Sequence, residues 1–414
     1  MTTIPDEMIP VDDALQIILE SVTPSLSETI VIADADGRVL NSDIIADMNI
    51  PPHDNSAMDG YAVQYSTLSN ASPESPVDLP VISELQAGDN ASELALDPGS
   101  AIRIMTGAPI PAGADAVIPV EDTEEIGGNV RIYRSLEKHE NVRFSGEDLM
   151  QGSVALRKGT VLRSAHIGLL ASLNMKEVQV SVRPHVAIIS TGNEVMEVGA
   201  PLGPGQIRNS NAYTLSAEVH RYGAIPHYIG IARDDPEDTR KKFLQAMEHD
   251  IIITTGGVSM GRYDLVKSIM KELGVDIRIS TIRMKPGKPM AFGTKGNRLF
   301  FGLPGNPVST MVSFLQFVRP AILRFMGANA LKKPVVTAVI DEEIRKKVGR
   351  RHFIRGHFHV ENGKLHVTST GEQGSGILRS MGAANCLIIL DEETGFVERG
   401  SPVRIQLIRH EEVE

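Results

Sequence analysis

The pattern of apolar and polar residues changes character along the chain. Between residues 183 and 330, short apolar runs alternate with stretches in which apolar residues recur at helical spacing. Such strands alternating with helices are typical of a parallel sheet covered by helices on both faces, with ligands bound at the strands' carboxyl ends. Strands are predicted at His185–Ile189, Ile225–Ile231 and Ile251–Thr254, and helices at Ala212–Tyr222, Pro236–Met247, Asp264–Glu272 and Val308–Phe325.

The segments on either side of this α/β module show other patterns. Between Val81 and Tyr133, short apolar runs are separated by Gly, Pro, Asp and Asn, which predicts a β-rich insert. After Pro334 the pattern contains short strands only, which predicts a small C-terminal β-barrel. Helices are predicted at Val11–Val22 and Ser164–Leu173. A chain of 414 residues exceeds the size of one hydrophobic core, so two to four domains are expected.

Composition and charge exclude several classes of protein. No apolar run approaches the roughly 20 residues of a membrane span, and the acidic segment Met1–Asp13 is unlike a signal peptide or transit peptide. The formal charge of -11 argues against a general nucleic-acid binder. The single cysteine, Cys386, lies in an apolar run and is expected to be a buried structural thiol. We expect a cytoplasmic protein with neither membrane nor nucleic-acid partners.

Acidic residues follow three strands of the predicted parallel sheet. Glu194, Asp234, Asp235 and Asp264 come shortly after the strands that begin at residues 185, 225 and 251. If these turns share one sheet edge, their carboxylates lie together, and carboxylate oxygens beside a phosphate are the ligands that Mg²⁺ prefers. For Asp235, which precedes Pro236 and a helix, an N-cap is the favoured interpretation.

Three glycine- and proline-rich turns accompany these carboxylates. The loop Thr254–Gly261 contains Gly256, Gly257 and Ser259, and glycine-rich loops that lead into helices commonly bind anions. It matches neither the P-loop nor the dinucleotide fingerprint. The turn that holds Lys285 and Lys288 concentrates positive charge, and Gly302–Pro307 forms a stiff connector between a strand and a helix. The combination favours an anionic ligand.

Two further polar segments are either ligand contacts or ordinary surface. Pro51–Ala62 is too polar for a core strand, and its density of Pro, Asn, Asp and Gly predicts a shaped loop. His53 and Asp54 within it can equally be turn formers. A basic run from Arg345 to Arg355 in the predicted barrel is typical of a solvated face or of a contact with a partner.

In their order along the chain, these motifs resemble the molybdopterin molybdenumtransferase family of molybdenum-cofactor biosynthesis, which includes the C-terminal domain of gephyrin. The matching pieces cover nearly the whole chain: Ser56–Ala62, Thr106–Pro109, Ser145–Asp148, Ser190–Glu194, Ser259–Asp264, Lys285–Pro289, Gly302–Ser309 and Gln373–Gly376.

The resemblance implies four domains and a reaction. The expected domains are a discontinuous linker domain (1–50 and 145–182), the β-rich insert (51–144), an α/β domain like that of molybdopterin adenylyltransferases (183–330) and the β-barrel (331–414). The implied reaction inserts molybdate into adenylylated molybdopterin and releases AMP, with Mg²⁺ as cofactor. The implied partners are a second copy of the chain, in an elongated homodimer, and a molybdopterin adenylyltransferase.

The resemblance also implies an active site shared between two subunits. Asp59 and Thr106 from the insert of one subunit would face the α/β domain of the other. That domain would supply the catalytic residues Glu194, Asp234 and Asp264, which would also hold the metal, and the substrate contacts Gly256, Gly257, Ser259, Lys285, Lys288, Pro304 and Pro307. Ser375 and Arg379 are further candidates from the barrel. The family often has Asp where this chain has Asn193, so no role is assigned to that position.

Two other functions remain open at this stage. A molybdopterin adenylyltransferase uses the same α/β module, but it does not need the flanking domains or the Asp59 segment. A non-catalytic, gephyrin-like dimeric scaffold would not need Asp59, Glu194 and Asp264 together. The metal-insertion reaction is therefore the favoured interpretation.

Overall fold

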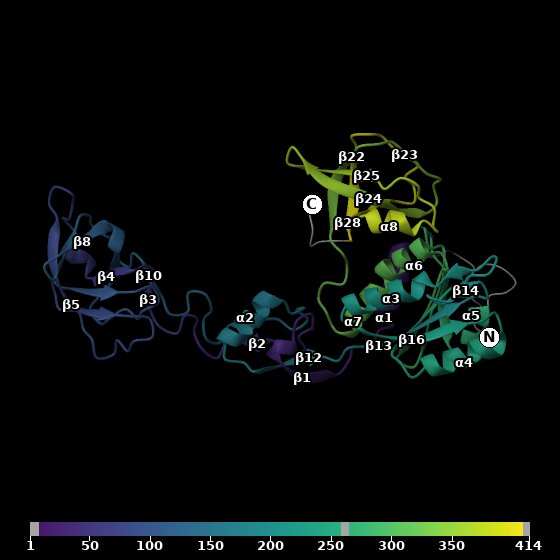
Figure 1. Ribbon diagram of the computed structural model, residues 1–414, viewed down its shortest axis with the longest axis horizontal. Coiled ribbons are helices and arrows are strands. Elements are labelled where there is room, and N and C mark those ends of the chain that lie inside the picture. The colour runs from purple at the N-terminus through teal and green to yellow at the C-terminus, as the bar shows by residue number, and fades with distance from the viewer. Residues whose placement is uncertain (1–7, 258–264, 409–414) are drawn as a thin grey trace. The chain divides into compact units, whose positions relative to one another are not determined.

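The computed structural model describes residues 8–257 and 265–408, which divide into two compact units (Figure 1). Among the described residues, unit 1 comprises 8–41, 158–163, 178–257 and 265–408, and unit 2 comprises 42–157 and 164–177. The residues expected to form the linker domain are divided between these two units. Within the described ranges, no helix is long and apolar enough to cross a membrane.

The centre of unit 1 is a six-stranded sheet in the order β16-β13-β17-β21-β20-β18. The predicted parallel sheet is confirmed, but it contains one reversed strand, β20, which forms a hairpin with β21 through Gly296 and Asn297. The parallel strands are β16 (Ile225–Ala232), β13 (His185–Thr191), β17 (Ile251–Thr255) and β21 (Arg298–Leu303), and β20 (Pro289–Lys295) runs antiparallel to β21 and β18 (Asp276–Thr281).

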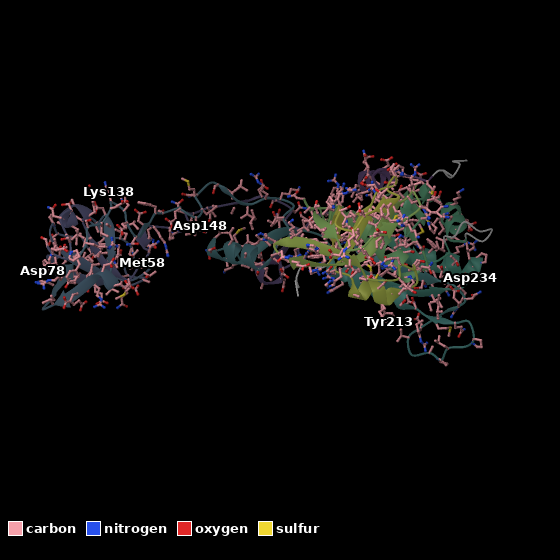
Figure 2. All side chains as sticks on the ribbon, turned by 90° about the horizontal axis from the view of Figure 1, so that it is seen from above. Met58, Asp78, Lys138, Asp148, Tyr213 and Asp234 are labelled. Atoms are coloured by element: carbon pink, nitrogen blue, oxygen red, sulfur yellow. The ribbon has the colours of Figure 1, made fainter. Side chains whose placement is uncertain are left out.

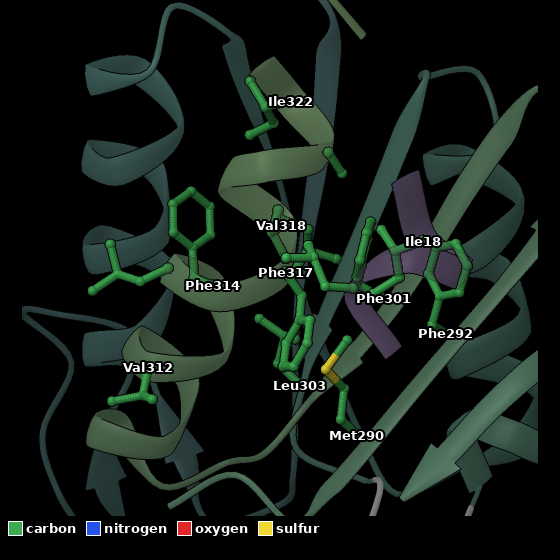
Figure 3. Close-up of a cluster of buried hydrophobic side chains, with 14 of the residues drawn as sticks. Ile18, Met290, Phe292, Phe301, Leu303, Val312, Phe314, Phe317, Val318 and Ile322 are labelled. Carbon is green, nitrogen blue, oxygen red and sulfur yellow. The ribbon is translucent and has the colours of Figure 1, made fainter. Parts of the chain in front are cut away.

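Helices cover both faces of this sheet because successive strand residues point to opposite sides. Ile251 and Ile253 belong to one buried cluster, with α1, α3, α6 and α7, whereas Ile252 belongs to the other, with α4 and α5. Figure 3 shows the first cluster, in which Phe292 and Phe301 pack with ring centroids 5.0 Å apart. The helices are α1 (Val11–Glu20), α3 (Ser210–Arg221), α4 (Pro236–Ala246), α5 (Leu265–Glu272), α6 (Pro307–Ser313) and α7 (Arg319–Phe325).

The single helix predicted at Val308–Phe325 contains a change of winding. α6 and α7 are joined without a break by a π-helical turn, Phe314–Val318. Pro320 follows this turn, and a proline ring in a helix clashes with the carbonyl four residues before it, here that of Gln316. The wider turn accommodates the proline while the apolar residues stay buried.

The C-terminal part of unit 1 is the predicted barrel. Five strands close because β24 pairs with both β25 and β26. Cys386 is fully buried in this barrel, as expected, and burial raises the pKa of its thiol to about 12. The strands are β22 (Val335–Ile340), β24 (Arg351–Glu361), β25 (Lys364–Ser369), β26 (Cys386–Leu390) and β28 (Pro402–Leu407), and α8 (Leu378–Ala383) lies between β25 and β26 in sequence.

Unit 2 contains the predicted β-rich insert, a six-stranded sheet in the order β7-β4-β6-β5-β9-β8. Its strand β4 (Gly60–Val63) is buried along its whole length, so the expectation that Pro51–Ala62 holds no core strand is wrong at its end. Small side chains let β4 pair closely with β6 and β7, and a Cβ on Gly60 would lie 1.9 Å from the Ile118 carbonyl oxygen. The other strands are β5 (Val77–Leu85), β6 (Ala101–Ile104), β7 (Ala116–Pro119), β8 (Thr123–Ile126) and β9 (Asn129–Ile132).

The remaining elements are short. The predicted helix after residue 163 is α2 (Ser164–Ser172), and the strand pairs are β1 (Ser27–Val31) with β12 (Glu177–Ser181), β2 (Ile44–Ile45) with β11 (Val154–Leu156), β3 (Asn55–Ser56) with β10 (Val142–Arg143), β14 (Val195–Met196) with β15 (Ile207–Arg208) and β23 (Ile344–Arg345) with β27 (Phe396–Val397).

Candidate functional site

The candidate site of unit 1 lies at the carboxyl edge of the parallel sheet. The strands β13, β16, β17 and β21 are parallel neighbours, so the loops that follow them meet at this edge. A cavity of about 440 Å³ opens there. Six of the predicted site residues line it: Glu194, Asp234, Gly256, Gly257, Pro304 and Pro307.

Two glycines allow the loops at this edge to approach closely. Gly256 has φ +91° and Gly257 has φ +68°, and a Cβ on Gly256 would lie 2.6 Å from Thr191 Oγ1. A Cβ on Gly305 would lie 3.5 Å from the Gly256 Cα, so the loops after β17 and β21 are in backbone contact. The Gly256 amide donates to the Leu303 carbonyl at 3.0 Å, so it fixes the loop and is not available to an anion.

Asp234 is held in place by Asn193, a residue to which no role was assigned from the sequence. The Asn193 amide donates to Asp234 Oδ2 at 3.2 Å, and the Asp234 amide donates to Asn193 Oδ1 at 3.1 Å. These two bonds join the loops after β13 and β16. The neighbouring Asp235 is the N-cap of α4, as predicted, because its Oδ1 accepts from the Asp238 amide at 2.8 Å. Asp234, labelled in Figure 2, is thereby left to face the cavity.

The beginning of α3 supplies cavity residues that the sequence did not reveal. Asn211 Nδ2 donates to Thr255 Oγ1 at 2.9 Å and to the Gly305 carbonyl at 2.8 Å. Asn209 caps α3, and its Nδ2 donates to Tyr228 Oη at 2.7 Å. The only available signal was the polar run Arg208–Asn211 immediately before a helix, and nothing in that run names its partners.

The lysine turn lies beside this cavity. A second cavity, of about 520 Å³, is lined by Lys285, Lys288 and Ser375, and it shares Pro289, Pro304 and Asn306 with the first. We call the two together the cleft. Lys285 is exposed and Lys288 is half-buried.

Backbone pairings hold this turn and the Ser375 loop against the cleft. Lys285 forms part of β19 (Met284–Lys285), which pairs with β24 of the barrel. The Ser375 carbonyl accepts from the Val308 amide at 3.1 Å, so the barrel loop lies over the start of α6. Thr310 Oγ1 donates to the Pro304 carbonyl at 2.6 Å, which fixes the connector that precedes α6.

Asp59 and Thr106 form a separate pair in unit 2. Asp59 Oδ1 accepts from the Thr106 amide and from Thr106 Oγ1, both at 2.7 Å. The backbone bond and then the hydroxyl bond from Thr106 lower the pKa of Asp59, so its carboxylate is ionised at neutral pH. Both residues are exposed, as is their neighbour Met58, which Figure 2 labels.

The remaining candidates are Ser259, Asp264 and Arg379. Ser259 and Asp264 lie outside the described residues. Arg379 is exposed on α8 and lines neither cavity of the cleft. Among residues 8–257 and 265–408, no three His, Cys, Asp or Glu side chains are grouped closely enough to hold a metal ion, so in this range Glu194 and Asp234 are the predicted metal ligands that the cleft brings together.

The basic run of the barrel is only partly a solvated face. Arg345 and Lys347 are exposed, but Arg355 is 1% exposed and donates to the carbonyls of Gln373, Glu372 and Gly374. Arg355 therefore supports the loop that carries Ser375. The expectation of a solvated run is wrong at this position, because the buried faces of β24 are not visible in a run of like charges.

The geometry of the cleft suits an anionic, phosphate-containing ligand. It combines two carboxylates that can hold a hard cation, two lysines that can neutralise an anion, and a rigid floor of glycine and proline. The single cysteine of the chain, Cys386, is buried in the barrel and lines neither cavity of the cleft.

Comparison with known proteins gives matches over nearly the whole chain. Residues 9–174 match the MoeA N-terminal region (domains I and II), residues 187–324 a probable molybdopterin binding domain, and residues 337–408 the MoeA C-terminal region (domain IV). The molybdopterin molybdenumtransferase of Haemophilus influenzae is 38% identical over 97% of this chain and 99% of its own length. That of Bacillus subtilis is 37% identical over 97% of this chain and 95% of its own length.

A solved structure agrees with these sequence matches. The crystal structure of the molybdopterin biosynthesis MoeA protein from Pyrococcus horikoshii OT3 is 33% identical. It covers 97% of this chain and 100% of its own, with a TM-score of 0.83. The expected multidomain fold is therefore shared along the full length of the chain.

Proposed function

Because the chain belongs to the molybdopterin molybdenumtransferase family, we propose that it inserts molybdate into adenylylated molybdopterin and releases AMP. The observation that carries this proposal is the cleft, in which carboxylates, lysines and a glycine-rich floor come together at one sheet edge. A substrate with a pyrophosphate bridge and a second, oxyanionic substrate both need such a concentration of compensating charge.

In this mechanism the protein mainly positions charge. Lys285 and Lys288 would neutralise the phosphate or molybdate, and the rigid Pro304–Pro307 connector would hold the nucleotide end of the substrate. Asp59, whose carboxylate is held by its two bonds from Thr106, would orient the substrate from the insert. The two dithiol sulfurs of the substrate form the Mo–S bonds, and the displaced molybdate oxygen leaves as water with their protons. A water molecule cleaves the phosphoanhydride to release AMP, so no protein thiol takes part.

We propose Mg²⁺ as the cofactor, held by Glu194 and Asp234 with Asp264 as a third ligand. Two carboxylates that line a phosphate cleft fit this ion, which usually keeps several waters and binds through one or two carboxylates and the substrate. When bound, it would stabilise the charge that develops on the phosphate as AMP leaves.

The test is the complete reaction with purified protein. Adenylylated molybdopterin, molybdate and Mg²⁺ should give AMP and active cofactor, and the Asp234→Asn protein should require at least about tenfold more Mg²⁺ for half-maximal AMP release. Glu237→Gln, on an exposed residue in the first turn of α4, is the matched control. AMP release that is independent of Mg²⁺ would exclude the metal role.

We further propose that the working enzyme is a homodimer with Asp59 and Asp234 of each site supplied by different subunits. Mixing inactive Asp59→Ala and Asp234→Ala proteins should then restore about a quarter of the activity, because half of the dimers are mixed and each has one intact site. If both residues of a site came from one chain, mixing would restore nothing. Light scattering gives the mass independently.

The alternative is an adenylyltransferase activity, which an assay with ATP and molybdopterin tests. ATP-dependent formation of adenylylated molybdopterin without use of molybdate would overturn the proposal. A gephyrin-like scaffold would be favoured instead if Asp59→Ala left cofactor insertion unchanged. The expected setting is the cytoplasm, where a molybdopterin adenylyltransferase would supply the substrate by direct contact.

A further inference from the structure

A second basic cavity in unit 1 has no part in the proposed reaction. It has a volume of about 500 Å³ and lies where α3 ends, at residues 220–223. The cleft is lined instead by the beginning of α3, at residues 208–211. The two cavities have no described lining residue in common. We call this second one the α3-end cavity.

The charge of the α3-end cavity is opposite to that of the whole chain. Its lining contains five cationic side chains and one acidic residue, Asp36, although the chain has a formal charge of -11. Asp36 lies 4.0 Å from one of them, and both partners of that pair are largely exposed. The cationic side chains are Arg163, Arg183, Arg221, Arg319 and Lys333.

Two of these guanidinium groups, on the buried Arg319 and the half-buried Arg183, each have a nitrogen atom without a partner among the described residues. Arg319 is 9% exposed, and it donates Nη1 to the Leu331 carbonyl at 2.8 Å and lies 4.8 Å from the centre of the Tyr222 ring. In the described part of the chain, the buried Nε atoms of Arg319 and Arg183 have no acceptor. Burial lowers the pKa of both arginines, and the neighbouring positive charge of Arg38 lowers that of Arg183 further.

A further carboxylate, Glu218, interacts electrostatically with Arg221, Lys333 and Arg319 but does not line the cavity. Glu218 on α3 is largely buried, its Oε2 has no partner among the described residues, and burial raises its pKa. The dipole of α3 explains Arg221 in the last turn of that helix. It does not explain Arg183, which precedes β13, or Arg319, which begins α7.

We propose that the α3-end cavity binds a small multivalent oxyanion that carries phosphate. Guanidinium groups match phosphate oxygens in pairs, and several of them around one cavity favour a charge of at least two on the ligand. The site is independent of the proposed reaction. Because α3 connects the two cavities, an anion at its end would stiffen the helix whose first turn holds Asn211 in the cleft.

Inorganic pyrophosphate, measured by titration calorimetry without Mg²⁺, is a suitable probe. The cleft is itself expected to bind anions, so the titrations use a Lys285→Gln, Lys288→Gln background. Removal of Arg183 and Arg221 by substitution with Gln should weaken binding at least about tenfold, since a charge-assisted hydrogen bond contributes more than one factor of ten. Arg324→Gln, which removes an exposed charge of α7 outside the cavity, is the matched control.

Hydrogen exchange locates the bound anion. Pyrophosphate should protect amides of residues 219–224 and 319–333 in the cleft-deficient protein. No binding at millimolar pyrophosphate and low salt, or an equal loss in Arg324→Gln, would overturn the proposal. It would also be overturned if Arg183→Gln, Arg221→Gln changed the oligomeric mass and left anion binding unchanged, because the cavity would then hold acidic residues of a second copy.

Discussion

The Asn211 side chain ties α3 to the ends of two central strands. Its amide donates to Thr255 at the end of β17 and to Gly305 after β21, at 2.9 and 2.8 Å, and Asn211 is 8% exposed. A neutral hydrogen bond contributes about 0.5–1.5 kcal/mol, so Asn211→Ala should cost about 2 kcal/mol. Because the cavity beside Asn211 can admit water, the cost should not exceed this figure greatly.

A protein of several domains does not unfold in one step, so a local measurement is needed. Hydrogen exchange of residues 303–310 reports the opening of the Gly305 loop, and a loss of about 2 kcal/mol should accelerate it about thirtyfold. Binding of the substrate should weaken in parallel, since both loops line the cleft. Thr214→Ala, on the same helix, removes only a bond to the Ser210 carbonyl and should leave this exchange within about twofold.

The reasoning would be refuted by unchanged exchange at residues 303–310 together with normal substrate affinity. That result would mean that packing of the glycine loops alone fixes the edge of the sheet. Asn211→Asp separates charge from geometry, because it presents a carboxylate oxygen to the Gly305 carbonyl. It should open the loop more than Asn211→Ala does.

Three further predictions follow from particular positions. Gly256→Ala should lower stability by about 2–4 kcal/mol and abolish substrate binding, because φ is +91° and the new Cβ would lie 2.6 Å from Thr191 Oγ1. The control is Gly296→Ala, whose new Cβ would have no atom within 4 Å. It should cost at most about 2 kcal/mol and leave binding normal. Phe301→Ala should lower the opening free energy of the sheet by about 3–5 kcal/mol, measured by hydrogen exchange of residues 299–303, since Phe301 is 1% exposed in the first buried cluster; a loss below about 1 kcal/mol would contradict the packing. The pKa of His352 is lowered to about 4, first by burial and then by the positive charges of Lys346, Lys285 and Arg350. Between pH 6.5 and 4 the unfolded chain therefore binds a proton that the folded chain does not. Stability should therefore fall by up to about 3 kcal/mol as pH drops through this window, and the difference between wild type and His352→Gln should show it; a pH-independent difference would exclude this cause.

Much of the α/β domain could be predicted because its central strands, such as β17 and β21, are largely apolar and buried. Ile251–Ile253 lie at the centre of the sheet and are packed on both faces, so this run of isoleucines predicts a buried strand. Strand β4 was missed because Gly60 and Ala62 are small and follow a polar segment, and their burial depends on strands 40 or more residues away. The π-helical turn depends on Pro320, whose effect on winding cannot be separated from a kink in sequence alone.

The residues of the candidate site also divide into those that local sequence predicts and those that it does not. Motifs that carry their own geometry, such as Gly256 or the Asp235 cap, could be identified from local sequence. Asn193 and Asn211 could not, because each acts by joining loops that are separated by 40 or more residues. Arg355 was assigned to the surface by its charged neighbours, whereas its partners are carbonyl groups, which no sequence pattern marks.

The two-residue strand β19 has a consequence for how the chain could be regulated. Its pairing with β24 makes Lys285 at once a part of the barrel sheet and a part of the turn that lines the cleft. A molecule that bound the outer surface of the barrel could therefore displace one ammonium group of the cleft without entering it.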